Sequence, residues 1–492
     1  MLTLTIFLPL LTGLAVLALP RHRPDLVRYI ALAGSVLTLG AALILWAGFD
    51  LGAGGLQWRM TLPWIPSVGA SYDVGVGGLS LALILLTAIL LTVVMAYVLG
   101  EHDRAHGHAF LFLLLATGLI GLFAAQDLLL FYLFFEVGLV PMYFIVGIWG
   151  GEGRRYAALK FFLYTRAGSL TMLLGFLALY LAMEPHSFSL PAIVQARPLD
   201  RAPLAGGLVF LALLVGFGVK LPIVPLHNWL PDAHVEAPTE GSVVLAGLQL
   251  KMGGYGMLAV LLPTLPETVA RFGWGLVALA LASLLYGALA ALAQSDMKRL
   301  VAYTSVNHMG FVTLGVAVAA LAENEGVRRL ALNGAAVQMV SHGFLTGGMF
   351  LMVGMLQHRT GTRDLDRFGG LISAMPAFSG LFGLLAFGSL GLPGLSGFIA
   401  EFQAIGAALQ LSAWVAALAV LALVVTTAVY LRLMTGLLMG RAPPNAPALA
   451  PLTAREAGVV GALAALSLGV GILPAVLVAL LDGTTAALAH FP

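Results

Sequence analysis

Long apolar runs are the feature that most constrains what this chain can fold into. The run LALILLTAILLTVVMAYVLG, which starts at Leu81, holds 20 residues without a charge, the length that an α-helix needs to cross a bilayer core. Of the 492 residues, 60% are hydrophobic and 9% are Asp, Glu, Lys or Arg, against roughly 25% charged residues in a soluble domain. The mean hydropathy is +1.00. The sequence therefore predicts an all-α polytopic membrane protein and not a β-barrel, whose segments would be short and alternating.

Fourteen segments are predicted to be membrane-spanning helices. The twelfth is predicted to be interrupted, and the thirteenth follows it directly. The connections at 50–77 and 183–204 contain Pro, Gly and few charges, and we expect them to form small surface caps. The helices are 2–20, 28–49, 78–100, 108–124, 127–149, 157–182, 205–226, 239–264, 272–294, 299–321, 330–356, 370–391 joined to 397–411, the remainder of the stretch to 437, and 456–481.

The absence of cysteine limits the chemistry of the chain. It excludes thiolate iron–sulfur ligation, disulfides and cysteine-based zinc sites, so electrons would have to move in a partner protein. The net charge of +2 gives no indication of nucleic-acid binding. The first Arg residues follow the N-terminal apolar run, so we expect a first membrane helix and not a cleaved leader.

Lys and Arg are distributed unequally between the two sides of the predicted membrane region. The connections after odd-numbered helices contain 14 of them and the opposite connections contain 6. Because basic residues favour the cytoplasmic side, both termini are predicted to be periplasmic in a bacterial cytoplasmic membrane. The 14 are Arg21, Arg23, Arg28, Arg104, Arg154, Arg155, Lys160, Lys298, Arg299, Arg359, Arg363, Arg367, Arg441 and Arg455, and the 6 are Arg59, Arg197, Arg201, Arg271, Arg328 and Arg329.

Two predicted helices contain residues that interrupt a regular helix. GVKLPIVPLHNWLP at 218–231 has three prolines, and GSLGLPGLSGF at 388–398 combines glycines with Pro393. An interior proline costs about 3 kcal/mol in a regular helix, and unpaired backbone at membrane depth persists only against protein or water. Paired breaks of this kind are typical of inverted-repeat transporters. The simpler alternative is that the prolines only kink packed helices.

The spacing of the breaks predicts the internal organisation of the chain. They fall in helices 7 and 12, which are five helices apart. Because an odd number of spans reverses the direction of the chain, the second repeat is inverted relative to the first. We therefore predict two inverted five-helix repeats, helices 4–8 and 9–13. The domains are 1–107 with helices 1–3, 108–264 with the first repeat, 265–437 with the second repeat, and 438–492 with helix 14.

Six of the ionisable residues in the predicted membrane helices are candidates for a relay, because a charge there costs roughly 2.5–3.5 kcal/mol on insertion scales. Residues in this setting usually mark ion or proton pathways, so we predict a proton relay. A neutral histidine bonded within its own helix is the alternative for two of them. The six are Glu136 in FFEVGLVPMYF, Lys220, Lys251, His308, His342 and Glu401.

Two further features concern charged groups near the relay. A Glu136–Lys220 ion pair is a hypothesis, because making or breaking it would change both proton affinities. Arg166 lies inside a predicted helix and either extends toward the membrane surface or pairs with a carboxylate.

The segment PLHNWLPDAHVEAPTE has poor spacing for a zinc site. We favour a mouth through which protons enter, or a tight loop. Its potential ligands are His227, Asp232, His234 and Glu236.

Several long stretches resemble the antiporter-like membrane subunits of proton-pumping NADH:quinone oxidoreductase (complex I). The resemblance runs through helices 3–13, and the subunit M group is the most similar. Glu401 favours that group, because the L and N subunits and related sodium/proton antiporter chains usually have Lys there. The chain also stops soon after helix 14, without the long lateral helix of subunit L. The stretches are 220–256, 134–151, 391–402, 298–311 and 72–81.

The resemblance implies a polar axis at the bilayer midplane with the broken helices at its centre. Two positions depart from the family: Gly77 stands where Asp is typical, and Arg166 stands where an uncharged residue is usual. The implied roles are an interacting pair for Glu136 and Lys220, a central relay for Lys251, connecting groups for His308 and His342, and a terminal acid for Glu401.

The predicted function is proton translocation in a respiratory NADH:quinone oxidoreductase, coupled to quinone reduction in other subunits. The chain would hold no cofactor, because FMN, iron–sulfur clusters and quinone would lie in partner subunits. Its neighbours would include L-like and N-like antiporter chains and lipids. One alternative is a chain of a multisubunit cation/proton antiporter, which sodium dependence would reveal. The other is a passive membrane scaffold, in which conservative replacement of Lys251 would spare transport.

Overall fold

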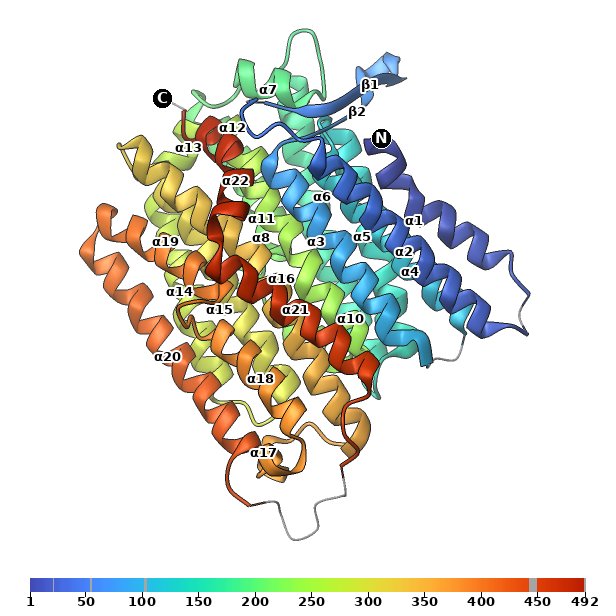
Figure 1. Cartoon of the computed structure of the whole chain (residues 1–492). Coiled ribbons are helices and arrows are strands. Elements are labelled where there is room, and N and C mark those ends of the chain that lie inside the picture. Colours follow the sequence, from blue (N-terminus) through green and yellow to red (C-terminus); the bar gives the residue numbers. More distant parts are fainter. Residues whose placement is uncertain (21, 54, 101–103, 442–448, 491–492) are drawn as a thin grey trace.

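The computed structural model describes residues 1–20, 22–53, 55–100, 104–441 and 449–490, so that Arg21, one of the residues used for orientation, lies outside it. Long helices run side by side, and a small β-hairpin lies at the end of the bundle near the N-terminus (Figure 1). Twelve of the described helices are long and apolar enough to cross a membrane, and three apolar helices are shorter. The predicted all-α membrane architecture is confirmed, whereas the number of fourteen spans stays a prediction.

The N-terminal half of the chain runs from α1 to α12 and includes the first broken helix. It contains the only two named strands of the described residues. Its elements are α1 (Leu2–Leu17), α2 (Pro24–Ala47), β1 (Gln57–Ile65), η1 (Pro66–Val68), β2 (Ala70–Val76), α3 (Gly78–Tyr97), η2 (Val98–Gly100), α4 (Ala105–Ala124), α5 (Leu128–Trp149), α6 (Arg154–Leu181), α7 (Leu190–Ala196), α8 (Pro203–Lys220), α9 (Trp229–Glu236), α10 (Thr239–Val244), the π turn η3 (Leu245–Gln249), α11 (Leu250–Gly256), the π turn η4 (Met257–Leu261) and α12 (Leu262–Thr264).

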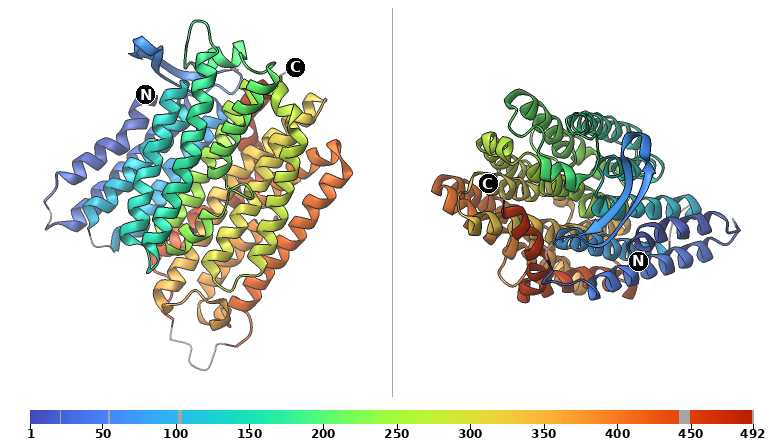
Figure 2. Two further views of the ribbon diagram at one scale, coloured as in Figure 1. Left: turned by 180° about the vertical axis from the view of Figure 1, so that it is seen from behind. Right: turned by 90° about the horizontal axis from the view of Figure 1, so that it is seen from above.

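The C-terminal half is helical throughout its described elements. They are α13 (Pro266–Arg271), α14 (Gly273–Leu292), α15 (Met297–Leu321), α16 (Glu325–Thr360), η5 (Leu365–Arg367), α17 (Leu371–Ala374), α18 (Pro376–Ser389), α19 (Ser396–Leu411), α20 (Ala413–Leu438), α21 (Ala454–Ile472) and α22 (Pro474–Ala489). Seen from above, α1 and α2 project from one end of the bundle and the hairpin lies across its top (Figure 2).

Both predicted helix interruptions are confirmed. The first separates Lys220, the last residue of α8, from Trp229, the first of α9. The second separates Ser389 of α18 from Ser396 of α19. The broken helices pack alike, since α6 contacts both α8 and α9, and α16 contacts both α18 and α19. The domain boundaries and the inversion of the repeats stay predictions.

The end of the chain differs from the prediction of one helix over 456–481. The structure has two helices there, α21 and α22, and Pro474 begins the second. A proline at this position removes a backbone donor and clashes with the preceding turn, which ends α21. In Figure 1, α21 runs obliquely across the bundle, and both helices pack against α16.

The predicted cap at 50–77 is a two-stranded antiparallel hairpin. It is tied to the start of α5, because the Ser71 N–H donates to the Asp127 carboxylate at 2.9 Å. The same carboxylate caps α5 by accepting from the N–H groups of Leu129 and Leu130. Burial raises the pKa of Asp127 despite these three donors. The hairpin therefore fixes the helix that carries Glu136.

The helix α16 connects the two halves of the molecule. It is 36 residues long and begins at the N-cap Asn324, whose side chain accepts from the Gly326 N–H at 2.8 Å. It packs against α10 and η3 on one side and against α15, α18 and α19 on the other. A helix in this position can place one side chain in contact with groups from both predicted repeats.

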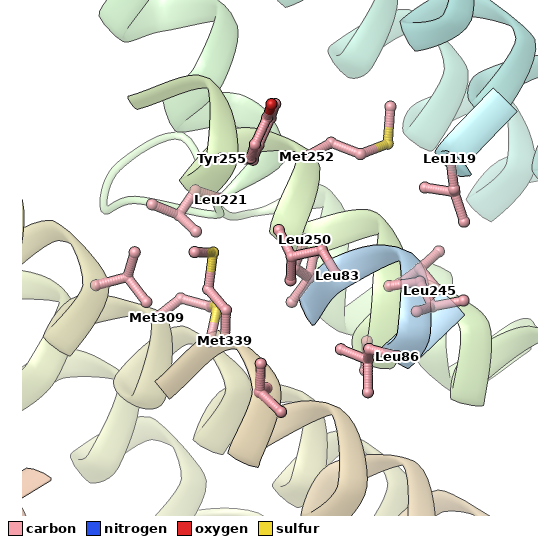
Figure 3. Packing of buried hydrophobic residues seen from close by; sticks show 14 of the residues in the cluster. Leu83, Leu86, Leu119, Leu221, Leu245, Leu250, Met252, Tyr255, Met309 and Met339 are labelled. Atoms are coloured by element: carbon pink, nitrogen blue, oxygen red, sulfur yellow. The ribbon is translucent and has the colours of Figure 1, made fainter. Parts of the chain in front are cut away.

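Apolar side chains close around the centre of the bundle (Figure 3). Met252, Met309 and Met339 are buried. The first two are the immediate neighbours of Lys251 and His308 in the sequence. Packing of this kind excludes bulk water and raises the cost of any ionised group that lacks a partner.

Gly253 allows α11 to approach the break after α8. A Cβ added there would lie 2.4 Å from the Phe217 carbonyl and 2.6 Å from the Leu221 N–H nitrogen. We expect Gly253→Ala to destabilise the chain by about 1–3 kcal/mol, as overpacking does, and to lower its melting temperature in detergent. Gly275→Ala is the control, since no atom lies within 4 Å of its added Cβ. Equal melting temperatures of the two variants would contradict the inference that Gly253 is required for close packing.

Candidate functional site

Four of the six predicted residues form a continuous line in the interior. Lys251 of α11 approaches His342 of α16, with 2.7 Å between Nζ and Nδ1. The rings of His342 and His308 of α15 have centroids 5.8 Å apart. His308 Nδ1 lies 3.5 Å from Oε1 of Glu401 on α19. All four side chains are buried, so the structure brings together groups that are 150 residues apart in the chain.

The first step of this line is a hydrogen bond whose direction follows the charge of Lys251. When Lys251 is protonated it only donates, so His342 Nδ1 accepts and the neutral imidazole carries its hydrogen on Nε2. The Nε2 atom has no hydrogen-bond partner in the described part of the chain. His342 can therefore take a proton from Lys251 at one nitrogen and release one at the other.

A small cavity lies beside the line. Its volume is 10 Å³, about enough for the centre of one water molecule. Polar atoms without hydrogen-bond partners among the described residues surround it, including both Glu401 carboxylate oxygens and Oε1 of Gln338. A water molecule there would have several partners and would join groups that are too far apart to bond directly.

The π turn η3 provides a partner for each lysine. Lys251 Nζ donates to the Ala246 carbonyl at 2.6 Å, and Lys220 Nζ donates to Gln249 Oε1 at 3.3 Å. The Gln249 amide in turn donates to the carbonyl of Gly138 on α5. A π turn widens the backbone ladder, and such turns are frequent at functional sites.

Lys220 occupies a site that suits a buried cation. It is the last residue of α8, where the helix dipole favours positive charge. Its ammonium lies 5.2 Å from the centre of the Phe161 ring and 5.9 Å from that of Phe135. These aromatic faces and the amide of Gln249 hold the charge without a carboxylate in contact.

The hypothesised Glu136–Lys220 ion pair is not formed. Glu136 Oε2 pairs instead with Nη1 of Arg166 on α6, and its Oε1 is buried without a hydrogen-bond partner. Arg166 also donates to the Tyr132 hydroxyl at 3.4 Å. The guanidinium reaches Glu136 because α5 and α6 pack side by side. Of the two alternatives for Arg166, pairing with a carboxylate is confirmed.

The residues of the predicted mouth do not gather into a metal site. Asp232 pairs with Lys160 at 2.7 Å and with Arg299 at 3.3 Å. The Glu236 carboxylate accepts from the Gly153 N–H at 2.8 Å. Within the described ranges, no three His, Cys, Asp or Glu residues are placed to hold a metal ion.

A larger cavity of 320 Å³ lies beside the end of α9 and the start of α10. Its lining includes Glu236, Glu240, Lys298 and Arg363. Glu240 is buried and lies 2.9 Å from Nε2 of His108. The cavity therefore offers water access to several titratable groups at one end of the bundle.

His234 lies buried near both this cavity and the central line. Its ring stacks on Phe350 with centroids 4.5 Å apart, and neither ring nitrogen has a hydrogen-bond partner among the described residues. The cations that act on it are Lys298, which lines the cavity, and Lys251. His227, by contrast, packs edge-on against Tyr286.

Some polar groups at the site were not predicted. Gln249 and Gln338 stand out as amides in apolar helices, a signal that was available in the sequence. A chain of buried hydroxyls joins Ser341 to Ser396 at 2.7 Å and Ser396 to Ser467 at 2.8 Å. Serine is common in membrane helices and bonds to its own backbone, so nothing in the sequence distinguishes these three.

Known proteins with this fold can now be compared with the chain. A sequence model of the family described as NADH:quinone oxidoreductase/Mrp antiporter, TM, matches residues 125–427. The chain belongs to this family. The matched region contains all six predicted relay residues together with Arg166 and Gln249.

Two relatives in bacteria are named as subunit M. The chain is 40% identical over 472 residues to the NADH-quinone oxidoreductase subunit M of Rhodobacter capsulatus, covering 93% of this chain and 90% of that protein. It is 42% identical over 407 residues to that of Rickettsia conorii, covering 81% and 80%. The predicted resemblance to the subunit M group is confirmed.

Solved structures agree on the fold. A chain of respiratory complex I from Thermus thermophilus matches with a TM-score of 0.89 and 32% identity over 99% of both chains. A chain of the Mrp complex from Dietzia matches with a TM-score of 0.84 over 99% of this chain and 96% of that one. At 23% identity, the second likeness concerns the fold alone.

Proposed function

We propose that this chain is the proton-translocating subunit M of a respiratory NADH:quinone oxidoreductase. The observation that carries the proposal is the buried line from Lys251 through His342 and His308 to Glu401. Each member can bind and release a proton, and each lies within one hydrogen bond or one bridging water of the next. The names of the subunit M relatives supply the enzyme class.

In this proposal the proton moves between side chains of this chain. Lys251 gives its proton to Nδ1 of His342, and the proton on Nε2 leaves toward His308 and then Glu401. The lysine is refilled from the cavity at the α9 end, for which His234 provides a buried titratable group on the way. A change in the charge of Lys220 alters the electrostatic potential at Lys251 and so sets when these transfers occur, while Glu136 supplies a fixed negative charge.

Partner subunits carry the redox chemistry in this proposal. FMN, iron–sulfur clusters and quinone lie in those subunits, and quinone reduction there drives the charge changes here. The direct neighbours include L-like and N-like antiporter chains and lipids. The chain lies in the bacterial cytoplasmic membrane with both termini periplasmic, following the excess of basic residues on the other side.

The test is Glu136→Gln in native membranes, with complex content matched on native gels. We expect NADH–quinone reduction and the proton gradient to fall together to less than about a tenth of the parental rates, because the substitution removes the buried carboxylate and leaves Arg166 without its ion-pair partner. Glu152→Gln, which removes an exposed carboxylate between α5 and α6, is the matched control. Parental rates in Glu136→Gln would make Glu136 a structural acid outside the relay.

Sodium dependence separates this proposal from a cation/proton antiporter. In the same membranes, with NADH as electron donor, the proton gradient should form equally well with sodium or with potassium as the only added alkali cation. A gradient that needs sodium and forms without electron transfer would favour the antiporter instead.

A further inference from the structure

Arg166 is an intramembrane cation whose charge is permanent. It lies in α6 between Leu163 and Leu170, whose side chains are 56% and 44% exposed, so this face of the helix is apolar. Its own side chain is 40% exposed, whereas that of Glu136 is 16% exposed. A guanidinium does not give up its proton in a protein. Arg166 can therefore act on a proton pathway only through its charge and its hydrogen bonds.

The contacts of Glu136 and Lys220 are separate. Glu136 bonds to Arg166, which also contacts Tyr132, whereas Glu136 reaches Lys220 only as a charge that acts across a distance. Lys220 bonds to the neutral amide of Gln249 at 3.3 Å. If Lys220 were the sole counter-ion of Glu136, loss of its proton would leave an uncompensated carboxylate inside the membrane. With Arg166 in contact, that penalty does not arise.

We infer that Arg166 is a positioning residue that keeps Glu136 ionised independently of Lys220. Lys220 can then lose and regain its proton while Glu136 stays a carboxylate turned toward α6. The consequence for proton movement rests on the proposed function, whereas the charge state of Glu136 does not.

The test reads the charge of Glu136 directly by infrared spectroscopy of the purified complex at neutral pH. A protonated carboxyl gives a C=O stretching band that a carboxylate lacks, and Glu136→Gln identifies its source. We expect no such band in Lys220→Met, because Arg166 remains in contact with Glu136. We expect the band in Lys220→Met combined with Arg166→Gln, and its loss again when Arg166→Lys replaces Arg166→Gln.

One control and two outcomes complete the design. Lys220→Met with Arg155→Gln removes an exposed cation from the same helix and should give no band. A band in Lys220→Met alone would overturn the inference, because Lys220 would then be the counter-ion. Absence of the band in the Arg166→Gln combination would overturn it as well. Lys220→Met alone decides whether Lys220 is the counter-ion of Glu136, even if the combined variant does not assemble. Neither infrared measurement depends on proton pumping.

Discussion

Lys251→Arg should abolish proton pumping although it keeps a positive charge at the centre of the site. Lys251 bonds to His342 at 2.7 Å and to the Ala246 carbonyl at 2.6 Å, and both contacts accept from a cation. An arginine can still donate to them, but it cannot release a proton to His342. We expect the pumping rate to fall on the order of 10²-fold, the usual effect of removing a positioned proton-transfer group.

The measurement is NADH-driven acidification in vesicles with the complex content matched. Lys251→Met, which removes the charge, should lower the pumping rate to the same extent, because both substitutions remove the transferable proton. Lys160→Arg is the matched control, since Lys160 lies near the surface and forms an ion pair with Asp232 that an arginine can also form. Pumping at the parental rate in Lys251→Arg would assign Lys251 a role of charge alone and would favour the scaffold alternative.

The sequence predicted the membrane helices and both interruptions because the signals are local. An apolar run of about 20 residues and a proline or glycine cluster act through the chain itself. Pro474 gives a similar local signal, but Pro9 and Pro141 lie inside uninterrupted helices. A single proline in an apolar run therefore does not decide whether a helix ends, whereas the clusters around Pro222 and Pro393 do.

The π turn and the hairpin could not be predicted in this way. The π turn η3 depends on how it and α10 pack against α16 and α3, and no residue type specifies it. Strand β1 alternates polar and apolar residues from Gln57 to Leu62, but its apolar Trp58, Met60 and Trp64 are exposed, so the alternation does not show what the hairpin packs against. Its register depends on contacts such as Ser71 with Asp127, which are 56 residues apart.

The candidate site shows which part of a relay can be predicted from composition. The six residues were found because each is ionisable in an apolar helix. Their pairing required three-dimensional contacts: in the one ion pair hypothesised, Arg166 replaces Lys220 as the contact of Glu136, and Glu136 acts on Lys220 only through its charge. Arg166 competes for the carboxylate from a neighbouring helix, and a sequence gives no distance between side chains of different helices.

Glu401→Gln should stop pumping at the other end of the line. Glu401 is buried on α19, and His308 is its nearest ionisable neighbour in the described structure, at 3.5 Å. The loop of the second break closes over it, since Gly391 has φ +80° and a Cβ added there would lie 2.3 Å from Glu401 Oε2. The site thus fits a carboxyl group tightly, and Gln fills the same volume without being able to take up a proton.

We therefore expect Glu401→Gln to lower the pumping rate on the order of 10²-fold with unchanged assembly. Glu401→Asp keeps the carboxyl but withdraws it from His308 by one methylene, so it should retain part of the rate. Glu323→Gln, in the exposed connection between α15 and α16, is the control. If Glu401→Gln pumps normally while Glu401→Asp does not, shape and not proton uptake is what the position requires, and the line must end at His308.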